Sequence, residues 1–141
     1  MNASTTSLDP NNPSAAQIMK SLLKRAKRRF RGFPVAVIRF FGPNKDQATK
    51  ISVAIFEQRN QAPISVQDYH LPDKEVREEA PILQVIKSEF KDNGVVSLLM
   101  ENDILGCPHQ PGQDYPVEGN CTQCSYWFDK PQNKQLKLEL P

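Results

Sequence analysis

Four side chains with the chemistry of zinc ligands lie in one stretch near the C-terminus, residues 106–128. The stretch reads GCPHQPGQDYPVEGNCTQCSYWF and contains all three cysteines of the chain and one of its two histidines. Eleven residues separate a Cys-x-His pair from a Cys-x-x-Cys pair. Thiolate and imidazole groups at such spacings are typical of a tetrahedral zinc site. The sequence therefore predicts one metal site whose ligands are Cys107, His109, Cys121 and Cys124.

Four protein ligands fill the coordination shell of zinc and leave no position for water or substrate. We therefore expect a structural zinc ion at the centre of a zinc-ribbon-like or knuckle-like module. The aromatic residues 126–128 follow the last ligand directly and are expected to cover the ion. Iron or another metal, and a metal-free set of cysteines, are the alternatives that ligand type leaves open. His70 stands apart from both pairs and is interpreted as a surface or packing residue.

Two segments, IRFFGPNKDQATKISVAI and GCPHQPGQDYPVEGNCTQC, resemble sequences of a small family of uncharacterised bacterial proteins. Its pattern pairs an RFFGP…ATK strand hairpin with a Cys-x-His…Cys-x-x-Cys ending, and the resemblance covers roughly residues 36–128. It implies the same four metal ligands and no established activity. Ser125 stands where a proline is common in that pattern, a departure that touches none of the ligands.

A second candidate site is a cationic segment near the N-terminus. Residues 1–44 carry eight basic and one acidic side chain, a net charge of +7, whereas residues 45–141 carry ten basic and fifteen acidic side chains, a net charge of −5. Cations at this density can lie along a phosphate backbone and release its counterions, so we predict binding to RNA or DNA. The cations concerned are Lys20, Lys24, Arg25, Lys27, Arg28, Arg29 and Arg31.

Other partners fit the same charge pattern. An acidic protein, or the acidic remainder of this chain, would attract the segment equally well. A membrane surface is a further alternative, because a membrane-surface helix would have a similar polar face. An organellar presequence is another, since the segment is rich in Arg and poor in acids, although Asp9 and the compact pattern that runs into the first strand argue against it. No base-reading or RNA-stacking motif is recognisable, so any binding to nucleic acid would be directed at the backbone.

The sequence shows no features of an enzyme and none of a secreted protein. It contains no recognisable pairing of a nucleophile with a base and no phosphate-cradling glycine loop, so we expect a non-catalytic binding or adaptor protein. The first residues lack the apolar core of a secretory signal, and three cysteines cannot all pair within one molecule. A reducing, cytoplasmic location is expected.

Residues 14–32 are predicted to form an amphipathic helix that carries these cations. Ser14 and Gln17 have the spacing of a capping box, and Gly32 is the expected stop. Apolar side chains recur every four residues along one face of the predicted helix, at Ile18, Leu22, Ala26 and Phe30.

Apolar and β-branched runs at residues 33–41 and 50–57 predict an antiparallel hairpin, with a short edge strand at 64–69. A helix over 81–92 then leads to a strand over 95–100. A crossover through a helix makes that last strand parallel to its neighbour, which gives a mixed sheet.

The predicted fold class is therefore α+β, a small mixed sheet with two helices and the C-terminal zinc module. The organisation that we expect, in chain order, is a disordered leader over 1–13, the basic helix over 14–32, an α/β core over 33–105, the zinc module over 106–128 and a flexible tail over 129–141.

Overall fold

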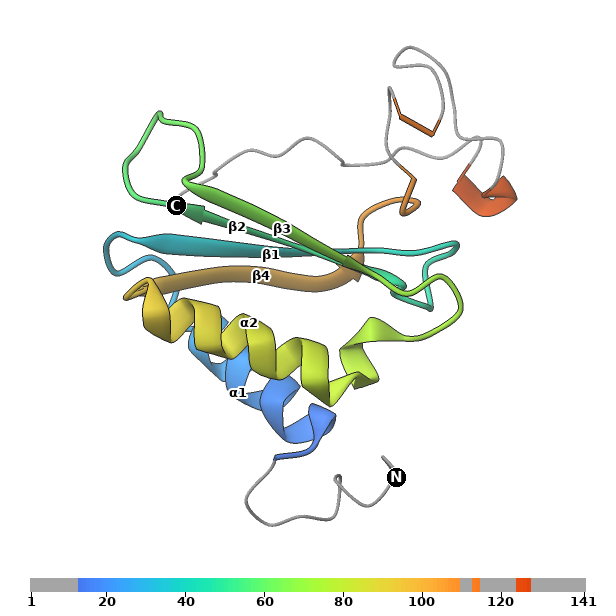
Figure 1. Ribbon diagram of the computed structural model, residues 1–141, viewed down its shortest axis with the longest axis horizontal. Helices are drawn as coiled ribbons and strands as arrows, with labels where there is room; N and C mark the ends of the chain where they lie inside the picture. The colour runs from blue at the N-terminus through green and yellow to red at the C-terminus, as the bar shows by residue number, and fades with distance from the viewer. Residues whose placement is uncertain (1–12, 110–112, 115–123, 128–141) are drawn as a thin grey trace.

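A computed structural model describes residues 13–109, 113–114 and 124–127 of the chain (Figure 1). At its centre is a four-stranded sheet in the order β3-β2-β1-β4. The elements, in chain order, are α1 (Ala15–Ala26), β1 (Val35–Phe41), β2 (Lys50–Phe56), β3 (Ser65–His70), the 3₁₀ turn η2 (Val76–Glu78), α2 (Ala80–Asp92), β4 (Ser97–Ile104) and the 3₁₀ turn η3 (Ser125–Trp127).

The sheet is mixed, as predicted. Strand β2 pairs antiparallel with both β1 and β3, whereas β4 pairs parallel with β1. The parallel pairing follows from the connection, because the chain leaves β3, passes through α2 and returns to the other edge of the sheet. The α+β fold class is confirmed, and the edge strand expected over 64–69 is present as β3.

Both helices lie on the same face of the sheet (Figure 1). Successive side chains of a strand point to opposite faces of the sheet. The helices pack on the face of β1 and β2 that carries Ile38, Phe40 and Ile51. Helix α1 contributes Ile18 and Leu22, which are 1% and 2% exposed. The N-terminal helix is therefore part of the hydrophobic core, and its cations occupy the remaining faces.

Helix α1 begins as predicted and ends earlier than the predicted range of 14–32. The Ser14 hydroxyl accepts a hydrogen bond from the Gln17 N–H at 3.2 Å, and the Gln17 side chain accepts one from the Ser14 N–H at 2.9 Å, so the capping box is confirmed. The helix stops at Ala26, and Arg29 then adopts a left-handed backbone conformation with φ of 60°.

The predicted stop at Gly32 was wrong because Phe30 does not belong to the apolar face of α1. Phe30 instead packs with Phe33 at a ring-centroid separation of 5.2 Å, against a second apolar cluster that contains Val35 and Val37. These two valines alternate with the core-facing residues of β1 and so point to the opposite face of the sheet. The chain must leave the helix before Phe30 to reach that face.

A side-chain contact ties the edge strand to the second helix. The Tyr69 hydroxyl on β3 donates to Glu89 Oε1 on α2 at 2.6 Å. Burial, together with this hydrogen bond, raises the pKa of Tyr69 to about 12. The phenol therefore stays protonated through the neutral range and holds β3 against the helical layer. Within the described residues, no helix is both long enough and apolar enough to cross a membrane.

Candidate metal centre

The segment that carries the first two predicted ligands is fixed to the end of the sheet. After β4, the Leu105 N–H donates to the Phe40 carbonyl oxygen at 2.9 Å, and the Gly106 carbonyl oxygen accepts from the Gly42 N–H at 2.9 Å. These backbone hydrogen bonds continue the pairing of β4 with β1 beyond the last strand residue. They place Cys107 directly beyond the sheet edge, where it is 1% exposed.

Three of the four predicted ligands converge. The ligand atoms of Cys107, His109 and Cys124 all lie within 4.8 Å of one another, and these residues could hold a metal ion. The Sγ atom of Cys124 is 3.4 Å from Nδ1 of His109, and Cys124 is 5% exposed. Two buried sulfurs and an imidazole are the donor set that zinc prefers, so the residues present fit the ion. Cys121 lies outside the described residues, as does most of the predicted zinc-ribbon or knuckle module, which stays a prediction.

Gly42 joins the two chain segments that carry the cluster. Its N–H bonds to Gly106 next to Cys107, and its carbonyl oxygen accepts from Nε1 of Trp127, three residues after Cys124, at 2.8 Å. A Cβ at Gly42 would lie 1.7 Å from the Gln47 carbonyl oxygen, so only glycine fits this turn. The hairpin turn between β1 and β2 is thus hydrogen-bonded to both segments of the candidate metal centre.

Trp127 is 7% exposed and packs within the main core, together with Cys107 and Cys124. The aromatic residues after the last ligand were expected to cover the ion, and the two of them that the structure describes, Tyr126 and Trp127, are in perpendicular ring contact at 5.0 Å. Phe128 lies outside the described residues. The two candidate cysteine ligands, Cys107 and Cys124, therefore share one hydrophobic core with the sheet and both helices.

A buried lysine beside the cluster was not found from the sequence. The Lys50 side chain is 9% exposed, its Nζ donates to the Pro108 carbonyl oxygen at 3.3 Å, and it lies 3.8 Å from Oδ2 of Asp68. Pro108 stands between Cys107 and His109, so Lys50 fixes the short turn that spaces them. One feature of the sequence indicated this buried position, a charged residue at the start of a mainly apolar strand.

His70 also lies closer to the candidate metal centre than its isolated place in the sequence indicates. Its ring centroid is 6.5 Å from that of His109, and the two rings are nearly perpendicular, at 88°. Burial lowers the pKa of His70, and the charges of Lys50 and His109 lower it further. The side chain is exposed, as expected of a surface residue, but it forms the rim of the cluster.

The predicted polyanion-binding residues lie on α1 and on the segment directly after it. Lys20 and Lys24 are exposed on α1, and Lys27 is its C-cap. Arg28, Arg29 and Arg31 follow the helix and are exposed. Arg25 differs from these because it is half-buried and contacts the chain near α2.

No protein-family model, curated protein or solved structure matches the chain. The resemblance to the family with the RFFGP…ATK hairpin stays a prediction.

Proposed function

We propose that this is a non-catalytic protein that contains a structural zinc ion and binds the backbone of RNA or DNA through the cations of α1 and the segment after it. The convergence of Cys107, His109 and Cys124 in a buried cluster carries the zinc assignment. With Cys121 as the fourth ligand, the coordination shell would be complete, and the ion would stabilise the C-terminal part of the fold. A reducing, cytoplasmic location would suit these thiolate ligands.

The exposure of the cations supports a polyanion as partner. Six of the seven predicted cations are exposed, with Arg25 the exception. In the part of the chain that the structure describes, the ion pairs are Lys45–Asp46, Lys50–Asp68 and Arg77–Glu75, so none of the seven is neutralised by a described carboxylate. The helix docks on its own sheet through apolar side chains and leaves Lys20, Lys24 and the C-cap Lys27 exposed.

The same packing argues for a polyanion over a membrane surface. A helix that lies on a bilayer inserts its apolar face among the acyl chains. In α1 that face contains Ile18, Met19 and Leu22, and all three are buried against the core. With these three side chains buried, α1 has little apolar surface left to insert, and its attraction to an anionic membrane would be mainly electrostatic.

A second candidate function, a protein-binding adaptor, is favoured by a groove along α1. Ala16, Met19 and Leu23 line this groove together with three lysines, Lys20, Lys24 and Lys27. Apolar side chains beside cations would suit an amphipathic, acidic segment of a partner protein. Of the residues that line this groove, binding to nucleic acid requires only the lysines, whereas binding to a partner protein would also require Leu23.

The test is the salt dependence of binding to single- and double-stranded RNA and DNA oligonucleotides. If about four cations contact phosphates, the plot of log K against log salt concentration should have a slope of about −3 to −4. The variant Lys20→Gln/Lys24→Gln/Lys27→Gln should reduce the magnitude of that slope by about 2 to 3, because three cation–phosphate contacts are lost.

The matched control is Lys45→Gln/Arg59→Gln/Lys74→Gln, which removes the same charge from exposed positions outside α1. It should leave the slope near that of the wild-type protein. Absent or salt-independent binding to every oligonucleotide would contradict the nucleic-acid function, and capture of an acidic protein that is lost in Leu23→Ala would then favour the adaptor.

A further inference from the structure

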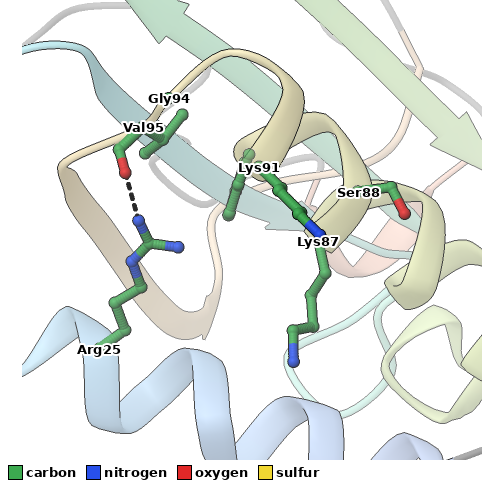
Figure 2. Close-up of a pocket in the computed structure, with 7 residues that line it drawn as sticks. Arg25, Lys87, Ser88, Lys91, Gly94 and Val95 are labelled. Carbon is green, nitrogen blue, oxygen red and sulfur yellow. Dashed lines mark hydrogen bonds between the residues drawn. The ribbon is translucent and has the colours of Figure 1, made fainter.

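A cationic pocket opens where α1 passes the C-terminal end of α2. Its volume is about 530 Å³, and three of its seven lining residues are Arg25, Lys87 and Lys91. Figure 2 shows Arg25 extending from α1 and Lys87 extending from α2 into the space between the helices, while Lys91 runs along α2 and its nitrogen ends beside Lys87. Among the described residues that line the pocket there is no carboxylate. Three cations without an acidic counterpart in one hollow indicate an anionic ligand.

Arg25 is held in a fixed orientation. One terminal nitrogen of its guanidinium donates to the carbonyl oxygen of Val95, and the guanidinium carbon lies 5.8 Å from the ring centroid of Phe90. In Figure 2 the other terminal nitrogen faces the pocket. A guanidinium has further N–H donors after one is used, and their planar arrangement matches the oxygens of a phosphate. Arg25 is thus positioned before a ligand arrives.

The two lysines are four residues apart and therefore lie on one face of α2. Both are exposed. Cations in the last turns of a helix complement its dipole. Lys87 and Lys91 could therefore have a structural role alone, without any ligand. Yet like charges at this spacing repel each other, and a third cation is brought to the same place from another helix. A shared anionic ligand explains why all three occur together.

We propose that this pocket binds one phosphodiester group of the nucleic acid whose backbone α1 contacts. This inference rests on the proposed function and adds Lys87 and Lys91 to its contact surface. The volume exceeds that of a single phosphate group and leaves room for the attached sugars. Arg28, three residues after Arg25 on the chain, is exposed and would contact a neighbouring phosphate.

The first test compares Lys87→Gln/Lys91→Gln with the control Lys45→Gln/Lys74→Gln, which removes equal charge elsewhere, in the full chain with the same oligonucleotides. Loss of two phosphate contacts should reduce the magnitude of the salt slope by about 1.4 to 1.8. The control should leave it unchanged. Equal slopes in the two variants would overturn the pocket proposal while leaving the α1 contacts, and so the proposed function, intact.

The second test is Arg25→Lys, which keeps the charge but cannot donate to Val95 and to a phosphate in the same geometry. Affinity should fall about tenfold, with the salt slope unchanged, because a charge-assisted hydrogen bond is lost but counterion release is not. An unchanged affinity would overturn the proposal. In ¹H–¹⁵N spectra, the Gly94 amide at the pocket rim should shift on oligonucleotide addition in the wild type and not in Lys87→Gln/Lys91→Gln. A wild-type protein that binds no oligonucleotide would overturn both proposals.

Discussion

Replacing Cys124 by serine is expected to abolish stoichiometric zinc binding and to unfold the C-terminal part of the chain. Cys124 is 5% exposed and its sulfur lies 3.4 Å from His109 Nδ1, so a serine hydroxyl at this position would be a poor ligand in this thiolate–imidazole cluster. The free energy of binding a structural zinc ion also stabilises the folded state of the residues around it, because the site does not exist in the unfolded chain. Metal analysis and near-ultraviolet circular dichroism of Trp127, the only tryptophan, would measure both effects.

The matched control is Ser125→Ala, at the exposed neighbouring residue, which should keep one zinc ion per chain. Retention of stoichiometric metal in Cys124→Ser would contradict the assignment of Cys124 as a ligand. Loss of metal with an unchanged tryptophan signal would show that the ion is bound but does not hold the fold.

Replacing Gly42 by alanine is expected to destabilise the protein by about 3 kcal/mol and to weaken zinc retention. The added Cβ would lie 1.7 Å from the Gln47 carbonyl oxygen, so the turn between β1 and β2 must move. That movement would disturb the hydrogen bonds of Gly42 with Gly106 and Trp127, which support the cluster from both sides. Urea unfolding and the rate of zinc loss to a chelator are the measurements.

Gly94→Ala provides the comparison, since an added Cβ there meets no atom within 4 Å and only the positive φ of 62° opposes the change. It should cost about 1 kcal/mol and leave zinc retention unchanged. Equal destabilisation by the two substitutions, with equal zinc retention, would show that Gly42 acts only through its own turn.

Local patterns predicted much of the fold. The capping box of Ser14 and Gln17 is a contact between residues three apart, and the strands were visible as apolar runs. The parallel pairing of β4 followed from the handedness and geometry of a helical crossover. The end of α1 could not be predicted in this way, because Phe30 continues the helical spacing but packs on the other face of the sheet.

The candidate site was predicted only as far as its ligand chemistry. The spacing of Cys107, His109 and Cys124 indicated a metal site, and the structure brings these residues together. The position of Lys50 beside Pro108 depends on the pairing of strands far apart in sequence, which a single sequence does not show. For the same reason the sequence did not predict that Arg25 lines one pocket with Lys87 and Lys91. It showed only that the two lysines are four residues apart.

Zinc-edge X-ray absorption on the purified, full-length protein tests the central claim most directly, because it reports both the metal and its ligands. We predict one zinc ion per chain, surrounded by three sulfur atoms at about 2.3 Å and one nitrogen at about 2.0 to 2.1 Å. This result would support a closed, structural site that includes Cys121. A chain without zinc, or zinc with an oxygen ligand in place of one sulfur, would contradict the account.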